Sequence, residues 1–452
     1  MSAIVRRREG MRRLPASVAA CIACAAFGGS EALADEPPAG TVKVGDEIVI
    51  AADGPGDRLR GCQAVARGND QYLAVWREGW VGAGGASRIF AARLGPDGKL
   101  LDRKGIEITP AAKQRQDRPR VAFCGDAYLV VWQEFNGRDM DVYGARIGLD
   151  GTVRDSKPLA IAVAPETQVM PEVATDGKAG FLVVWQGFVG EETAARGFAA
   201  TVGTNGQVGQ PVTHACVPRP NVVWSDTEYL VWGGPTGAFL EMTLQRVGAN
   251  GQLVGQGWKR FGSADSIGTG YAVGGAVHTS VAHRPGHGWL MLCDRAVPDF
   301  WGWGGPGALR AYAIEADGKL DATQPKETQP KAGQLQPNWV DVVKGEKEKK
   351  TWPYARNAVA WDGRQFVAMW TIFHFGATGA DLINGDLMLA RIDGWKSREG
   401  MTPIAVAATT TNELNPAVAT DGAGTLLCVY EKQPDDARAN MVIAARLIRT
   451  SR

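Results

Sequence analysis

The sequence lacks several features that would indicate common functions. Its 452 residues include only five histidines, its formal net charge is only +1, and no CxxC pair occurs after residue 34. After residue 27 no segment approaches the roughly 20 apolar residues that a membrane span needs. Without these features we expect no metal site, no cofactor, no nucleic-acid partner and no membrane span.

The N-terminus has the pattern of an export signal. A basic stretch from Arg6 to Arg13 precedes the apolar segment 14–27, and Ala32-Leu33-Ala34 offers a small-x-small cleavage site. We therefore expect residues 1–34 to be a signal peptide and the mature protein to be periplasmic or extracellular. "VAAC" (18–21) also fits lipoprotein cleavage with a lipid anchor at Cys21, but its short apolar lead-in favours ordinary cleavage.

Little charge and an odd number of cysteines remain after this cleavage. The removed segment carries five arginines and two glutamates, which leaves a formal charge of about −2. Five cysteines remain, so they cannot all pair within one chain. We expect Cys293 and Cys428, which lie in apolar strand runs, to be buried as small hydrophobic residues.

The chain is built from a unit that occurs seven times. Its most regular part is an apolar strand that mostly ends in Trp: "QYLAVW" (71–76), "AYLVVW" (127–132), "FLVVW" (181–185), "EYLVW" (228–232), "GWLMLC" (288–293), "QFVAMW" (365–370) and "TLLCVY" (425–430). A short Val-Ala strand and a turn precede most copies, as in "PEVATDG" (171–177) and "PAVATDG" (416–422). A third strand follows, such as "VYGARI" (142–147), then an Asp-Gly or Asn-Gly turn pair and a fourth strand.

Four antiparallel strands in each of seven units predict an all-β, seven-bladed β-propeller. The last unit ends without a fourth strand, and "DEIVIAA" (46–52) resembles the fourth strands of other units. We expect residues 35–452 to form one propeller in which about 42–62 supplies the outer strand of the last blade. Two separate β-sandwiches would not explain this complementarity between the ends.

On these repeats the chain resembles the secreted bacterial proteins built from "VAxDGxxYLVVW … YGARxxxDG" units, which are generally regarded as β-propellers. The resemblance covers nearly all of residues 42–450. It implies an architecture but no shared activity and no catalytic residues. The Ser-x-Asp-x-Gly-x-Thr-Trp box of sialidases, the Trp-Asp repeat ending and the quinoprotein Trp motif are missing.

Residues that recur in most blades are interpreted as structural. We expect the second-strand tryptophans to pack between blades. The third-strand arginines are expected to donate structural hydrogen bonds or to stack, and Glu78 and Glu134 belong to a repeated Trp-x-Glu setting. The arginines are Arg93, Arg146, Arg246, Arg391 and Arg446.

Blades five and six break the pattern on one face of the predicted disc. Their loops after the second strand contain Trp301 and Trp303 (in 298–307) and His374 (in 372–385), and an insertion at 322–356 contains Tyr354. Aromatic side chains in Gly-rich loops suit stacking on sugar rings or peptide side chains. The alternative is that they cover one another as a local minicore.

The residue just before each first strand is expected at the mouth of the central channel on the same face. The seven positions are Cys62, Arg118, Met170, Arg219, His278, Arg356 and Asn415. Arg118, Arg219, His278 and Arg356 together would bind a carboxylate or sulfate, because Arg offers a bidentate fork. Alternatively, these side chains pair with acids such as Asp117 and Glu413.

Two functions remain open at this stage. The first is an exported binding scaffold that holds a glycan or protein ligand on this face. The second is a carbohydrate-active enzyme, most plausibly a lyase acting on an acidic polysaccharide, with Tyr354, His374 and His278 beside Arg356. A metal shared by His278, His283 and His287 is disfavoured, since the last two flank a turn on the far face.

Overall fold

The computed structural model describes most of the chain after residue 40. The described residues are 41–52, 58–80, 86–109, 114–188, 195–216, 218–236, 241–255, 259–261, 278–295, 308–315, 340–344, 351–375, 382–392, 402–433 and 441–451. The predicted signal peptide, residues 1–34, lies outside them.

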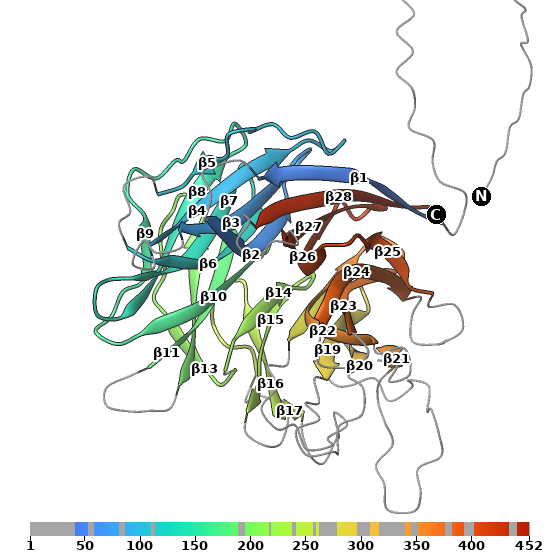
Figure 1. Ribbon diagram of the computed structural model, residues 1–452. Coiled ribbons are helices and arrows are strands. Elements are labelled where there is room, and N and C mark those ends of the chain that lie inside the picture. The colour runs from blue at the N-terminus through green and yellow to red at the C-terminus, as the bar shows by residue number, and fades with distance from the viewer. Residues whose placement is uncertain are drawn as a thin grey trace, which may run out of the picture. The chain divides into compact units, whose positions relative to one another are not determined.

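The described strands form seven four-stranded antiparallel sheets, as expected for the seven repeats. Each of the first six sheets takes its strands in sequence order, starting from β2, β6, β10, β14, β18 and β22. The first strands of neighbouring sheets contact one another around a complete ring. The all-β, seven-bladed propeller is therefore confirmed (Figure 1).

Within a blade the strands run from the channel outward, and their bounds follow the repeat. The first strands are β2 (Arg58–Arg67), β6 (Gln116–Cys124), β10 (Gln168–Thr175), β14 (Asn221–Trp224), β18 (Thr279–Arg284), β22 (Thr351–Trp361) and β26 (Asn412–Thr420). The second strands are β3 (Tyr72–Trp80), β7 (Ala127–Phe135), β11 (Gly180–Gly187), β15 (Glu228–Thr236), β19 (Gly288–Arg295), β23 (Phe366–Phe375) and β27 (Thr425–Gln433).

The outer half of each blade is shorter in several cases. The third strands are β4 (Ser87–Leu94), β8 (Met140–Gly148), β12 (Arg196–Gly203), β16 (Glu241–Gly248), β20 (Ala308–Glu315), β24 (Leu382–Ile392) and β28 (Val442–Thr450). The outer strands are β5 (Ile106–Glu107), β9 (Leu159–Ala162), β13 (Val212–His214), β17 (Lys259–Phe261), β21 (Val340–Lys344), β25 (Ile404–Ala407) and, in blade seven, β1 (Val42–Ala51).

The ring is closed by the N-terminal strand. β1 pairs antiparallel with β28, so blade seven has the order β1-β28-β27-β26 and the predicted strand exchange is confirmed (Figure 1). A register shift lies between Val44 and Glu47. Because of it, Val42 and Val44 pack into the core between blades six and seven, whereas Ile48 and Ile50 pack between blades seven and one.

Two predicted boundaries need correction. The outer strand of blade seven ends at Ala51 rather than near residue 62, since β2 of blade one already starts at Arg58. The insertion expected at 322–356 includes β21, the outer strand of blade five, and the beginning of β22 in blade six. Both errors arose because a short fourth strand has no Trp or turn signature of its own.

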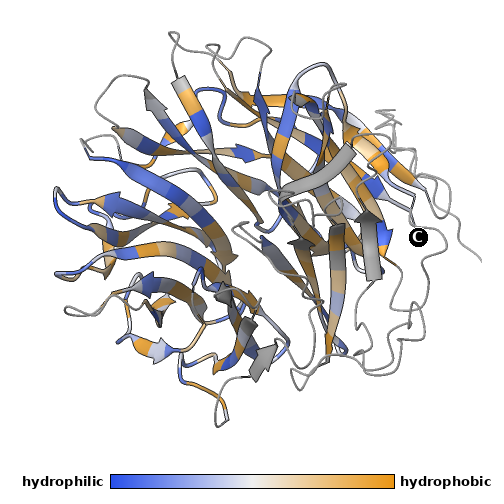
Figure 2. Ribbon diagram, turned by 60° about the horizontal axis from the view of Figure 1, so that its bottom comes forward, coloured by the Kyte–Doolittle hydropathy of each residue, from blue (hydrophilic) through white to orange (hydrophobic). Residues whose placement is uncertain are grey.

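The core consists of seven clusters, each formed by two neighbouring blades. Figure 2 shows hydrophobic residues along the strands. The repeated tryptophans belong to these interfaces and are at most 3% exposed: Trp76, Trp132, Trp185, Trp232 and Trp370. Their predicted role in packing between blades is confirmed, and Cys293 and Cys428 are buried as expected.

Three of the third-strand arginines, Arg93, Arg146 and Arg391, also join blades. The Arg93 guanidinium binds both oxygens of Asp102 in its own blade, and its Nη1 donates to the Leu149 carbonyl of the next blade at 2.7 Å. Glu78 and Glu134 accept from the indoles of Trp76 and Trp132 at 3.4 and 3.1 Å. These recurrent polar residues are therefore structural.

Candidate functional site at the channel mouth

The seven positions expected just before the first strands lie inside the strand in five blades, because each of these strands begins before the irregular point. In β2, β6, β10, β22 and β26 a register shift brackets this position, for example between Asp117 and Arg120 around Arg118. In blades four and five, Arg219 and His278 come just before the first paired residue. The side chain at this position is therefore released from the sheet's regular alternation.

Five of these residues adopt left-handed backbone conformations, although none is glycine. Their φ angles lie between 39° and 57°, in Arg118, Met170, Arg219, Arg356 and Asn415. A Cβ is strained in this region by about 1–2 kcal/mol. The same costly conformation occurs at equivalent points of five blades. It is therefore a shared feature of the backbone, and it turns the side chain away from the sheet.

The preceding blade holds this feature of the backbone in place. The residue after a second-strand Trp reaches the backbone of the next mouth residue: Gln133 accepts from the Met170 N–H at 2.9 Å. Gln186 accepts in the same way from the Arg219 N–H at 3.1 Å. Blade packing therefore compensates for the strained turn and fixes the mouth residues relative to one another.

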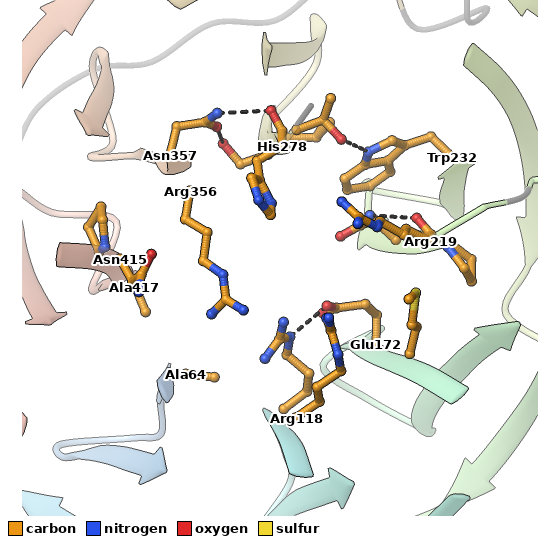
Figure 3. A pocket seen from close by; sticks show the side chains of 18 of the residues that line it. Ala64, Arg118, Glu172, Arg219, Trp232, His278, Arg356, Asn357, Asn415 and Ala417 are labelled. Atoms are coloured by element: carbon orange, nitrogen blue, oxygen red, sulfur yellow. Dashed lines mark hydrogen bonds and ion pairs between the residues drawn. The ribbon is translucent and has the colours of Figure 1, made fainter. Parts of the chain in front are cut away.

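The mouth opens on a cavity of about 290 Å³. Its lining includes the predicted Arg118, Arg219, His278 and Arg356, and Figure 3 shows their side chains directed into the same space from four blades. Arg120 and Glu172 also line it, and Arg120 Nε donates to Glu172 Oε1 at 2.6 Å. Four arginines and one carboxylate give the described lining a clear positive excess.

His278 is anchored through its own backbone carbonyl and through the side chain of its neighbour Thr279. The Asn357 amide of blade six donates to the His278 carbonyl at 3.0 Å, and the Trp232 indole of blade four donates to Thr279 Oγ1 at 3.0 Å. Burial above all, together with the charges of Arg356, Arg219, Arg118 and Arg120, lowers the pKa of His278 to about 4. The imidazole is therefore neutral at pH 7.

The acids considered as alternative partners are engaged elsewhere. Asp117 lies 3.8 Å from Arg77, accepts from Arg115 Nη2 at 3.4 Å and accepts the backbone N–H of Arg118 at 2.9 Å. Glu413 accepts from the hydroxyls of Thr409 and Thr411. Both carboxylates therefore serve local turns and ion pairs of the blades.

The remaining predicted site residues do not join this cluster within the described structure. His374 lies at the end of β23, where its Nε2 is 2.8 Å from Asp386 Oδ2, and it does not line the cavity. Trp301 and Trp303 and the side chain of Tyr354 lie outside the described residues. Their assignment as ligand-binding residues stays a prediction.

Sequence reasoning missed Arg120 and Glu172, which form a second layer beneath the mouth. Each stands two positions after a mouth residue, beyond a proline, in the "R-P-R" and "M-P-E" sequences of blades two and three. The sequence could have indicated them, because only blades two and three carry a charged residue at this position. The other blades carry uncharged residues there, such as Asn221, Ser280 and Ala417.

No protein-family model and no curated protein matches the sequence. Among solved structures, an acylaminoacyl peptidase of Pyrococcus horikoshii shares 11% identity at a TM-score of 0.45, over 84% of this chain and 51% of that one. The chain thus spans about half of the peptidase. The endosialidase of phage phi92 shares 9% at 0.44, over 90% and 69%. A Dyadobacter fermentans protein of unknown function shares 10% at 0.43, over 90% and 99%.

Two negative findings apply to the described part of the chain. It contains no helix long and apolar enough to cross a membrane. It also contains no group of three His, Cys, Asp or Glu residues placed to hold a metal ion.

Proposed function

We propose that the protein is an exported binding scaffold whose channel mouth holds an acidic glycan through its carboxylate or sulfate groups. The observation that carries the proposal is the convergence of Arg118, Arg219 and Arg356 on one cavity, close enough to lower the pKa of His278. Guanidinium groups bind both kinds of anion with two parallel hydrogen bonds. The N-terminal export pattern agrees with a ligand met outside the cytoplasm.

The rigidity of the site supports binding. The backbones of Met170 and Arg219 are held by the preceding blade, so little backbone freedom is lost there when a ligand arrives. The partly enclosed cavity also weakens screening by water, which strengthens charge–charge attraction. A scaffold of this kind would recognise an anionic group through arginines that are already in place, without a conformational change that closes around the ligand.

The lyase alternative gains less support. Proton abstraction needs a base whose pKa is near the working pH, and an imidazole with a pKa of about 4 is a weak base at neutral pH. His374 is occupied by Asp386 in blade six. The described residues of the mouth thus offer anion-binding groups without a matched general base.

The test is a binding screen with uronate-containing and sulfated oligosaccharides, followed by incubation with the polymers that bind. Replacing Arg118, Arg219 or Arg356 singly by Gln should weaken binding by about tenfold or more, because a charge-assisted hydrogen bond contributes about 1.5–3 kcal/mol. The matched control is Arg154→Gln, which removes an arginine paired with Asp126 at the exposed rim.

The outcomes separate the two functions. Binding that the mouth substitutions weaken and the control does not, with no change in polymer length, supports the scaffold. New unsaturated sugar ends would establish a lyase instead. Equal affinity of the wild type and the triple variant would remove the channel mouth as the binding site.

A further inference from the structure

Blade three lacks an ion pair that blades one and two share. In those blades a third-strand arginine binds an aspartate nine residues later, as Arg146 binds Asp155 with its Nη2 and Oδ1 2.6 Å apart. At the equivalent points of blade three the sequence has Thr201 and Gln210. Cation and anion have been replaced together.

The missing arginine would have joined blade three to blade four. Arg146 Nη1 donates to the Thr204 carbonyl of the next blade at 2.8 Å, beside the turn glycine Gly206. The carbonyl equivalent to that of Thr204 in blade four belongs to Ala249, which precedes Asn250-Gly251. The nearest part of Thr201 to Gly251 is its methyl group. A Cβ atom added to Gly251 would lie 2.9 Å from this Cγ2.

A cavity of about 300 Å³ occupies this position. Its described lining includes both Thr201 and Ala249, and it lies between blades three and four on the side of the Asx-Gly turns, away from the channel mouth. Its other polar lining residues are Asp176, Asn205, Gln207, Tyr229 and Asn250. It is thus a polar space at the point where an arginine side chain lies between earlier pairs of blades.

Asp176 gives this cavity a negative charge. Its residue is only 8% exposed, and its Oδ1 accepts the backbone N–H groups of Lys178, Ala179 and Gly180. The equivalent acid of blade six, Asp362, accepts similar N–H bonds and lies 3.7 Å from the third-strand Arg391. Blade three keeps the carboxylate but lacks the arginine.

We propose that this cavity is a binding site for an external guanidinium group, held by the Asp176 carboxylate and the Ala249 carbonyl. The chain's own arginines use the same two kinds of acceptor, a carboxylate of their own blade and a carbonyl of the next blade. The ligand would therefore occupy the space that the guanidinium of Arg93 or Arg146 fills elsewhere. The group would come from a small guanidinium compound or from an arginine side chain of another protein.

The first experiment uses ethylguanidinium as the probe. Ligand-observed NMR on the full-length protein should show saturable binding at roughly millimolar affinity, given so few ligand atoms. A crystal soaked with the probe should place it beside Asp176. Asp176→Asn keeps an Oδ1 acceptor for the turn but removes the charge, and it should weaken binding by at least tenfold. Asp126→Asn, in the corresponding turn of blade two, is the matched control and should leave it unchanged.

The second experiment fills the cavity with an arginine side chain of the protein itself. The double variant Thr201→Arg/Gln210→Asp restores the pair of blades one and two, and it should abolish probe binding while raising the melting temperature. Arg146→Ala opens an equivalent space beside Asp155 and should gain a second ethylguanidinium site. If the double variant fails to fold, Asp176→Asn and Arg146→Ala still decide the matter.

Defined results would overturn the proposal. These are the absence of saturable binding to the wild type, binding that Asp176→Asn leaves unchanged, or probe density elsewhere. If the site binds, N-acetyl-arginine amide and an arginine-containing peptide distinguish the sources. Equal affinity for the amino-acid amide and the peptide indicates a small guanidinium compound as the ligand. Tighter binding of the peptide indicates an arginine side chain of another protein.

Discussion

The charges around His278 make ligand binding at the mouth sensitive to protons. The unliganded imidazole faces Arg118, Arg219, Arg356 and Arg120, and Glu172 is the carboxylate among the described lining residues. An anion bound among these arginines offsets their charge. The pKa of His278 then rises somewhat above its unliganded value of about 4, while burial still holds it below the ordinary value, so protonation favours binding.

We therefore expect affinity for a sulfated ligand to increase as the pH falls from 7 to 5. The gain should be roughly two- to threefold at pH 5 and should grow further toward the free pKa, because the bound state holds more protons in that range. A sulfate group stays ionised throughout, so the ligand contributes no titration. Isothermal titration calorimetry at several pH values measures the change.

The control for this effect is His278→Asn, which should bind with little dependence on pH. A wild-type affinity that stays constant between pH 5 and 7 would show that the imidazole does not face the bound anion.

At the scale of the element, the left-handed residue at the irregular point of the first strand is the feature that creates the mouth. Four of the five left-handed residues precede proline: Arg118, Met170, Arg219 and Asn415. A residue before proline is normally extended, so the sequence indicated a plain entry into a strand. The repeat alignment nevertheless identified the positions, because equivalent residues of a propeller lie at the same radius.

Substitutions at Met170 test this left-handed conformation. Met170→Gly should stabilise the protein slightly or leave it unchanged, since glycine adopts positive φ at little cost. Met170→Ile should lower the free energy of unfolding by about 1–2 kcal/mol, because a β-branched side chain fits this region poorly. Urea unfolding midpoints compare the two variants. An isoleucine variant as stable as the glycine variant would mean that the residue is not left-handed.

The sequence could reveal the missing arginine of blade three but not the cavity. "GFAATV" visibly departs from "VYGARI", yet a neighbouring side chain could have filled the space. Whether it does depends on packing between blades three and four, which no local pattern encodes. The same limit applies to Arg120 and Glu172, whose convergence depends on the closed ring.

For the whole molecule, closure by β1 is the feature on which the ring depends. Glu47 of β1 accepts from the Tyr430 hydroxyl at 2.8 Å and lies 3.0 Å from Lys432, both in β27. The strand also supplies apolar side chains to two of the seven interblade cores. The sequence predicted this closure because the last repeat lacked a strand that the N-terminus resembles.

Removing β1 should destabilise the entire ring. A chain that starts at residue 53 leaves β28 as an open edge and loses several buried aliphatic side chains, at a cost on the order of 5 kcal/mol. We expect a lower melting temperature and aggregation in light scattering. A chain that starts at residue 37 keeps β1 and serves as the control. Equal melting temperatures for the two truncations would contradict the closure.

The antiparallel pairing of β1 with β28 also sets how the protein responds to mechanical load. Val42 lies opposite Thr450, so both free ends of this pair are at the same end of the ladder, while Ala51 lies opposite Ile443 at the other. Tension between the two termini would load the hydrogen bonds one after another instead of all together. If the protein is tethered through its N-terminus and pulled at its C-terminus, the ring opens at this seam, by peeling, before any blade is sheared.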